Sequence, residues 1–195
     1  MSKSLQLARY RAAQFFAAAQ AGLAARRGSS QPDLTTDEVA LVASILPAAA
    51  QQALFHRMSA NDRRHALAVL QTLRQAGHTD LALLQAALLH DMAKSLGQPL
   101  GHRVLIVLFN AFWPAALARL ARLKSTQAVT QVGPWRRPFV IHAQHPTIGA
   151  AWAEAARCEP VAVQLIACHQ DKLPSIPANE TERLLAALQW ADNLN

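Results

Sequence analysis

The chain has few glycines and few segments that alternate between apolar and polar residues as β-strands do. Glycine occurs 7 times in 195 residues, and alanine and leucine, which favour helices, dominate. Hydrophobic residues make up 52% of the chain and charged residues 16%. This length and composition suit one domain, or one domain with an extra arm, that buries a sizeable core. The sequence therefore predicts an all-α fold.

Cysteine is also scarce, which argues against a secreted, disulfide-stabilised protein. The two cysteines, Cys158 and Cys168, lie in a helical stretch and form no CxxC pair. Reduced, buried thiols are the expectation for both. The N-terminus has a basic start but no continuous leucine-rich core and no clear cleavage site, which disfavours a signal peptide. We therefore expect a cytoplasmic protein.

Acidic residues are absent from the whole segment 92–153. The basic residues of this segment are Lys94, Arg103, Arg119, Arg122, Lys124, Arg136 and Arg137. Such asymmetry favours an anionic partner, which can be a phosphate-bearing substrate, a lipid surface or nucleic acid. Nucleic acid is the weakest of the three, because no recognition motif or aromatic stacking platform is present.

The main candidate for membrane contact is the uncharged run 104–118, between Arg103 and Arg119. At ~1.5 Å per residue it falls short of a ~30 Å hydrocarbon core, and Pro114 interrupts it. It predicts a helix bent or divided at Pro114. Its apolar surface, with Phe109, Phe112 and Trp113, is expected in the core, in a homo-oligomer contact or in a peripheral membrane contact.

Capping residues and helix breakers divide the chain into helical segments. Thr35 and Glu38 have capping-box spacing, and Gly77 is expected just after the end of a helix. Trp190 of the last helix is expected to face the core. The expected helices cover residues 5–27, 35–46, 48–57, 59–75, 80–94, 103–124, 145–157, 160–169 and 179–192.

Histidine and aspartate recur at positions where they can bind a metal. On the helix expected over 80–94, neighbours His90 and Asp91 lie ~100° apart and Lys94 shares their side. Imidazole nitrogen and carboxylate oxygen are ligands for first-row divalent cations. Four further candidates lie on other expected helices: His65, His145, His169 and Asp192. Six such residues at core-facing positions need polar partners, which a metal site supplies. His142, one turn before His145, is expected to pack.

This order of residues resembles the HD-domain superfamily of metal-dependent phosphohydrolases, over about residues 59–195. It looks most like the HDIG-type subgroup that includes bacterial diadenosine-tetraphosphate hydrolases. The His-His-Glu and Gly-Tyr-Pro signature of cyclic-di-GMP phosphodiesterases is missing, and Met92-Ala93 stands where Ile-Gly is usual. The resemblance is carried by Arg63-Arg64-His65-Ala66-Leu67, Ala87-Leu88-Leu89-His90-Asp91-Met92-Ala93-Lys94, His145-Pro146-Thr147-Ile148-Gly149-Ala150, Leu165-Ile166-Ala167-Cys168-His169 and Trp190-Ala191-Asp192.

The resemblance implies a role for each candidate residue. Asp91 would bridge two cations, and Lys94 would contact a substrate phosphate, which makes these two the expected catalytic residues. Arg136 and Arg137 lie in a segment that the resemblance does not cover, and they either bind the anionic tail of the substrate or are solvated. The cofactor would be one or two divalent cations, from among Fe, Mn, Ni, Co, Zn and Mg. The implied core ligands are His65, His90, Asp91 and Asp192, and the additional ligands of dinuclear members are His145 and His169.

The resemblance also implies an architecture and a function. We expect an HD-domain helical bundle over 59–195, with an apolar, basic helical insert at about 100–140 and an N-terminal helical extension over 1–58. The expected activity is hydrolysis of a phosphoric ester or anhydride in a nucleotide, a dinucleoside polyphosphate or another phosphate ester. The alternative is a catalytically weak nucleotide-binding or regulatory module, with the insert at a membrane surface or on a partner.

Overall fold

The structure, a computed structural model, describes residues 34–97, 99–123 and 129–195. Within these ranges every regular element is helical, with nine α-helices, two 3₁₀ helices and no strand. The prediction of an all-α fold is confirmed. The helix expected over 5–27 and the side chain of Lys124 lie outside the described residues.

The chain forms two compact units. Among the described residues, the first, here called the bundle unit, comprises 34–97 and 141–195, and the second comprises 99–123 and 129–140. Because α6 and α7 make up most of what the structure describes of the second, we call it the α6–α7 unit. Residues 34–58, which the sequence assigns to an N-terminal extension, belong to the bundle unit. The boundaries drawn from the sequence stay predictions.

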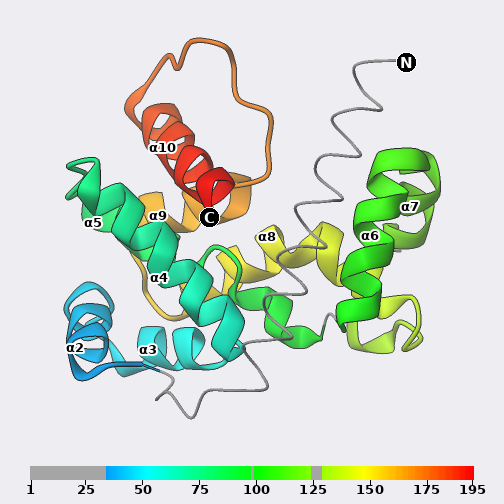
Figure 1. Ribbon diagram of the computed structural model, residues 1–195, viewed down its shortest axis with the longest axis horizontal. Coiled ribbons are helices and arrows are strands. Elements are labelled where there is room, and N and C mark those ends of the chain that lie inside the picture. The colour runs from blue at the N-terminus through cyan, green and yellow to red at the C-terminus, as the bar shows by residue number, and fades with distance from the viewer. Residues whose placement is uncertain (1–33, 98, 124–128) are drawn as a thin grey trace. The chain divides into compact units, whose positions relative to one another are not determined.

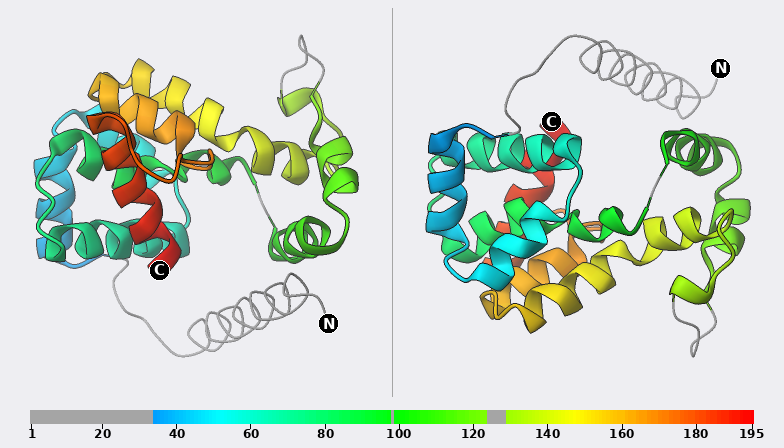
Figure 2. Two further views of the ribbon diagram at one scale, coloured as in Figure 1. Left: turned by 90° about the horizontal axis from the view of Figure 1, so that it is seen from above. Right: turned by 90° about the horizontal axis from the view of Figure 1, so that it is seen from below.

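The bundle unit is built around α5, whose residues from Ala82 to Leu89 are all buried. This helix packs against α2, α3, α4, α9 and α10, and Figures 1 and 2 show α10 beside α4 and α9. A helix that is apolar all round requires such enclosure. The elements are α2 (Thr36–Ile45), α3 (Ala49–His56), α4 (Ala60–Gln75), α5 (Leu81–Leu89), η1 (Met92–Leu96), α9 (Pro160–Cys168), α10 (Glu180–Leu194) and the part of α8 (Arg137–Ala155) from Ile141 on.

The starts of four helices follow the capping residues seen in the sequence. The side chains of Thr35, Ser59, Asp80 and Asn179 each accept a hydrogen bond from a backbone N–H in the first turn. Thr35 forms the expected capping box with Glu38. These local predictions are confirmed. The sequence was sufficient to make them because a cap depends only on neighbouring residues.

The helix predicted over 80–94 is shorter than expected. The α-helix ends at Leu89, and Met92–Leu96 form the 3₁₀ helix η1. Asp91 has φ −102° and ψ 2°, the sparsely populated bridge region in which many active-site residues lie. The prediction of one continuous helix through Lys94 was therefore wrong.

The start of the helix predicted at His145 was also wrong. Helix α8 begins eight residues earlier, at Arg137, and Pro146 lies inside it. The sequence reading treated Pro146 as a first-turn residue, where a missing N–H is harmless. The prediction that Trp190 faces the core was also wrong. Its side chain is 45% exposed, whereas Leu188 on the same helix is fully buried.

The α6–α7 unit has a small core of its own. Helices α6 (Leu100–Phe112) and α7 (Pro114–Ala121) pack against each other and are followed by η2 (Val129–Gln131) and the first turn of α8. The predicted division at Pro114 is confirmed. The core cluster consists of the buried residues Ile106, Leu117 and Phe139, with Phe109 and Leu120 packed against them. Among the described helices, none is long and apolar enough to cross a membrane.

Candidate metal centre

The bundle unit brings together all six predicted ligands from five segments of the chain. His65 lies on α4, His90 and Asp91 follow α5, His145 lies on α8, His169 follows α9, and Asp192 lies on α10. They form two groups, in each of which one potential ligand atom per residue lies within 4.8 Å of the others. The buried group is Asp91, His145 and His169, and the open group is His65, His90 and Asp192.

The buried group excludes solvent almost completely. Oδ1 of Asp91 lies 3.3 Å from Nε2 of His145 and 3.7 Å from Nε2 of His169, and all three side chains are less than 10% exposed. The two Nε2 atoms face each other at 3.2 Å. Three potential donors thus converge in an environment of low dielectric constant.

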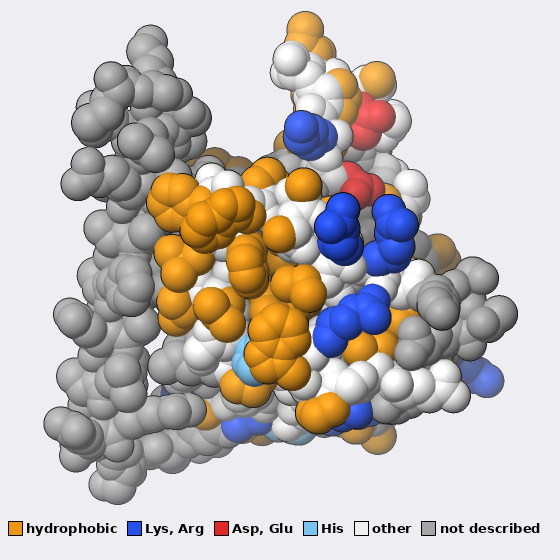
Figure 3. Space-filling model, turned by 90° about the vertical axis from the view of Figure 1, so that its right-hand side faces the viewer, with side chains coloured by type: hydrophobic (Ala, Val, Ile, Leu, Met, Phe, Trp, Pro, Cys, Tyr) orange, Lys and Arg blue, Asp and Glu red, His pale blue; other side chains and the backbone are white. Residues whose placement is uncertain are grey.

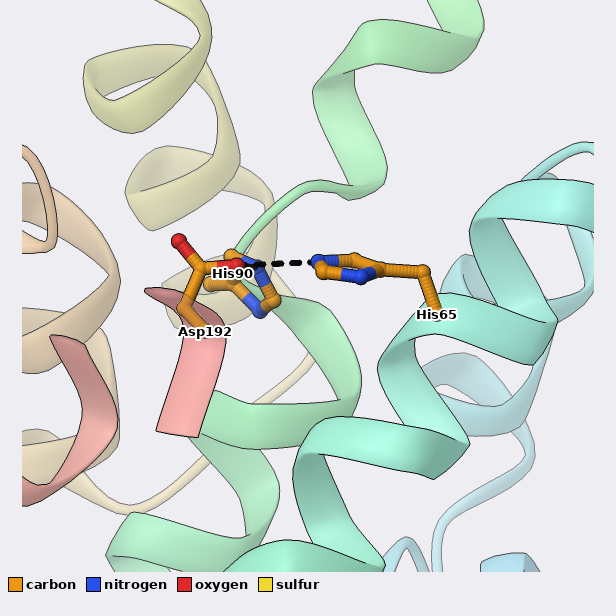
Figure 4. A group of neighbouring side chains, drawn as sticks. All are labelled: His65, His90 and Asp192. Atoms are coloured by element: carbon orange, nitrogen blue, oxygen red, sulfur yellow. Dashed lines mark hydrogen bonds and ion pairs between the residues drawn. The ribbon is translucent and has the colours of Figure 1, made fainter. Parts of the chain in front are cut away.

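The open group lies at the surface side of the same cluster. His65 approaches from α4 and its Nε2 lies 2.9 Å from Oδ1 of Asp192, which projects from α10 (Figure 4). The side chains of His65 and Asp192 are 28% and 35% exposed. His90, the third member, is only 1% exposed, so the open group is reached by solvent from one side.

His90 and Asp91 join the two groups. Nε2 of His90 lies 3.4 Å from Oδ1 of Asp192 and 3.7 Å from Oδ2 of Asp91. The ring of His90 also contacts the rings of His65 and His169, with centroids 5.6 Å and 5.3 Å away. His90 belongs to the open group and the next residue, Asp91, to the buried group. A carboxylate shared by two cations is compatible with this arrangement.

The three buried histidines are oriented in the same way. Nδ1 of each ring donates to the backbone carbonyl three residues earlier, at 3.1 Å from His90 to Ala87, 2.7 Å from His145 to His142 and 2.8 Å from His169 to Ile166. A carbonyl only accepts, so the proton of the neutral ring is on Nδ1 and the lone pair is on Nε2. Such hydrogen bonds are typical of histidines that bind a metal.

Helix ends explain two of these hydrogen bonds. Ala87 and Ile166 lie in the last turns of α5 and α9, where carbonyls lack intrahelical donors. The histidine that follows each helix supplies the missing donor. One hydrogen bond therefore completes the helix end and turns Nε2 of the ring toward the carboxylates.

Pro146 explains the third hydrogen bond, which lies inside α8. A proline has no N–H, so Pro146 cannot donate to the carbonyl of His142 four residues earlier. Nδ1 of His145 occupies that carbonyl instead. The proline inside α8 thus creates the acceptor that orients the neighbouring ligand.

The charges of the carboxylates are favoured by their surroundings. Burial raises the pKa of Asp91, but the charges of Lys94 and His90 outweigh it and hold that pKa well below the usual range. Burial likewise opposes the charge of Asp192, but its hydrogen bond with His65 and the nearby imidazole of His90 lower its pKa overall. Both groups therefore have carboxylates in the form that binds a cation.

The pKa values of the buried imidazoles shift in different directions because their charged neighbours differ. Burial, and then the charge of His90, lower the pKa of His169 to about 4, so this ring is neutral at neutral pH and its lone pair is able to bind a metal. Burial also disfavours the charge of His90, but Asp91 and Asp192 outweigh it and raise its pKa. His90 thus attracts a positive charge at Nε2, whether a proton or a metal ion.

The residues present fit a divalent cation. Nε2 of His90 is buried without a hydrogen-bond partner, and unpaired buried polar atoms are costly. Nε2 of His145 and Nε2 of His169 face each other at a distance at which both lone pairs can bind one cation. A donor set of neutral imidazoles and carboxylates suits transition metals and zinc. The observations support a cation centre without selecting the metal.

The other predicted site residues differ in position. The ammonium group of Lys94 donates to Oδ2 of Asp91, since residues three apart are eclipsed in a 3₁₀ helix. Arg136 and Arg137 belong to the α6–α7 unit; Arg136 donates to the carbonyls of Leu120 and Arg122, and Arg137 to that of Val132. A contact of the two arginines with substrate stays a prediction.

Two glutamines at the centre were not anticipated from the sequence. Nε2 of Gln170 lies 3.3 Å from Nε2 of His145, where it can donate to the imidazole lone pair. Gln189 donates to the carbonyls of His169 and Asp171 at 3.0 Å and 2.8 Å, which holds the segment after α9 against α10. Gln189 lies three residues before Asp192, so helical spacing was the one available signal for its position.

Comparisons of the chain with protein-family models, with curated proteins and with solved structures find no match.

Proposed function

We propose that the protein is a metal-dependent phosphohydrolase of the HD-domain type. The observation that carries the proposal is the common orientation of the buried imidazoles, whose Nδ1 atoms donate to backbone carbonyls and whose Nε2 atoms converge on two carboxylates. Hydrogen bonds of this kind orient the imidazoles toward the carboxylates. Preorganisation of this kind is what metal catalysis requires of a protein.

The two groups would hold one cation each. His65, His90 and Asp192 would bind the first, and Asp91, His145 and His169 the second, and Asp91 would contribute to both. When bound, such cations supply Lewis acidity to a phosphoryl group and to the attacking water. The remaining chemistry belongs to side chains of the protein.

Lys94 is the residue proposed to contact phosphate. Its side chain is 23% exposed and its ammonium group lies against Asp91, so it is at the centre and reaches solvent. An ammonium group there offsets negative charge that develops on phosphoryl oxygens. The solvent-accessible edge formed by His65 and Asp192 gives the substrate a route of approach. The substrate class proposed is a nucleotide, a dinucleoside polyphosphate or another phosphate ester.

The test is a phosphate-release assay with chelator-treated protein reloaded separately with Mn²⁺, Fe²⁺, Co²⁺, Ni²⁺, Zn²⁺ and Mg²⁺. We expect hydrolysis of at least one member of a panel of nucleotides and dinucleoside polyphosphates. Asp91→Ala should abolish metal retention and lower turnover by on the order of 10³-fold, because both cations lose a ligand. The matched control is Glu154→Gln, which changes an exposed carboxylate on α8.

The outcome separates catalysis from binding. Metal-loaded, folded protein that turns over no substrate, while nucleotides raise its thermal midpoint, would favour the regulatory module instead. Equal activity of Asp91→Ala and Glu154→Gln would contradict the proposed centre.

A further inference from the structure

The α6–α7 unit exposes aromatic side chains that its small core does not cover. Trp113 is 61% exposed and Trp135 57%, and Leu105 and Phe112 are exposed on α6. Figure 3 shows hydrophobic side chains gathered on the side of the molecule where α6 and α7 lie in Figure 1, with Lys and Arg side chains beside them. Clustered apolar exposure of this kind marks an interaction surface.

The exposed aromatics form a connected series rather than scattered side chains. Phe112 contacts Trp113 with ring centroids 6.0 Å apart, and Trp113 contacts Phe109 at 6.2 Å. Phe109 contacts Phe139 at 6.0 Å, and Phe139 contacts Trp135 at 5.3 Å. The two exposed tryptophans thus contact the same small core. We call the four exposed side chains, Leu105, Phe112, Trp113 and Trp135, the aromatic face.

The backbone at Trp135 is also held in place. Nε2 of His102 on α6 lies 3.2 Å from the carbonyl oxygen of Trp135, and its ring lies against Phe139. These contacts fix the segment before α8 beside α6. The indole of Trp135 therefore projects from an ordered backbone, which lowers the entropy cost of inserting it into another phase.

Charge selects the partner. Residues 99–140 contain six Lys or Arg residues and no acidic residue, whereas 34–98 and 141–195 contain eight basic and eleven acidic residues. Arg119 and Arg122 are exposed. Exposed tryptophans combined with basic residues and amphipathic helices match an anionic lipid surface, in which indoles occupy the headgroup level. A second copy docking through the same face would place two basic surfaces together, and nucleic acid would leave Leu105 and Phe112 uncovered.

We propose that the aromatic face of the α6–α7 unit docks on the surface of an anionic lipid bilayer. The 13 residues of α6 span about 20 Å, which suits a helix lying along the interface and not one crossing it. The positive charge of residues 99–140, which contain no acidic residue, draws the unit to the headgroups, and Trp113 and Trp135 enter the interfacial layer. This contact is independent of the chemistry at the metal centre.

The experiment is flotation of the full chain with phosphatidylcholine vesicles, with and without phosphatidylglycerol, at low and high salt. We expect binding only to the anionic vesicles and release at high salt. Trp113→Ser/Trp135→Ser and Arg119→Glu/Arg122→Glu should each weaken the partition coefficient at least about tenfold, since one basic residue near an anionic surface contributes about fivefold.

Matched controls on the bundle unit make the test specific. Trp190→Ser removes another exposed tryptophan, and Arg74→Glu/Lys172→Glu reverses two exposed charges. Both should float like the unaltered protein, and circular dichroism should show all variants folded. The proposal is overturned by absence of vesicle binding, by equal losses in test and control variants, or by a Trp113-dependent dimer or a duplex DNA complex in place of vesicle binding.

Discussion

The buried and open groups of ligands have the same residue types, one aspartate and two histidines, in different surroundings. Asp91, His145 and His169 are sealed from solvent, whereas His65 and Asp192 are partly exposed. Both rings of the buried group are oriented by backbone carbonyls, but His65 is oriented by the carboxylate of Asp192. The buried group is therefore the more rigid site, and the open group is the one that substrate and solvent can reach.

The comparison predicts unequal effects for removal of one histidine from each group. We expect His145→Ala to weaken metal binding by at least about 100-fold, because substitution of second-layer residues alone costs 10–100-fold. His65→Ala should leave one cation firmly bound. Equilibrium dialysis with elemental analysis measures both. Retention of a cation by His145→Ala together with its loss from His65→Ala would reverse the ranking.

Pro146 gives a way to disturb orientation without removing a ligand. In Pro146→Ala a new N–H competes with Nδ1 of His145 for the carbonyl of His142. We expect the thermal midpoint of the metal-free protein to rise, while metal affinity falls by about tenfold. Pro160→Ala, at the first turn of α9 where a proline costs no hydrogen bond, is the matched control. Parallel changes in stability and affinity would argue against the orienting role.

Gly149 tests the packing beneath the buried group. A Cβ added there would lie 3.3 Å from Cγ2 of Ile166 and 3.9 Å from Cβ of Ala93, whereas one added at Gly101 would meet nothing within 4 Å. Gly101→Ala should stabilise the protein by up to about 1 kcal/mol. Gly149→Ala should gain less stability and should lower metal affinity several-fold, because α8 must shift from α9. Isothermal titration with Mn²⁺ and thermal unfolding compare the two variants, and identical behaviour would show that the close approach has no effect.

The smallest expected effect concerns the pH dependence of stability, to which His142 beside the buried group contributes. His142 lies against His145 with ring centroids 6.2 Å apart, and burial followed by the charge of His145 lowers its pKa from 6.5 to about 4. The unfolded state therefore binds this proton first, so stability is present above about pH 6.5 and is lost as the pH falls toward 4. His142→Gln should lower the number of protons that the metal-free protein takes up on unfolding by up to one. An unchanged pH dependence would place His142 in a more solvated environment.

The helix starts and the ligand set could be predicted from the sequence. Helix starts at Thr35, Ser59, Asp80 and Asn179 were predicted because a cap is a local interaction. The six ligands were predicted from their residue types and from the family resemblance, which implies a role for each, and the need of polar residues at core-facing positions for partners supported the set. All six meet in the bundle unit.

The orientation of the ligands was not accessible in the same way. Residue types do not show that Asp91 leaves the helix after α5, or that α8 begins at Arg137 and contains Pro146. Both depend on packing around α5 and on which backbone carbonyls lack a donor. Trp190 was misplaced for a related reason, since α10 buries Leu184, Leu188 and Ala191 and turns Trp190 outward.

The most direct test of the metal centre is anomalous X-ray diffraction from crystals of the full chain loaded with Mn²⁺, recorded above the manganese absorption edge. The account predicts a peak enclosed by Asp91, His145 and His169, and a second, of equal or lower occupancy, beside His65, His90 and Asp192. A folded, manganese-soaked protein with no peak in either group would contradict it.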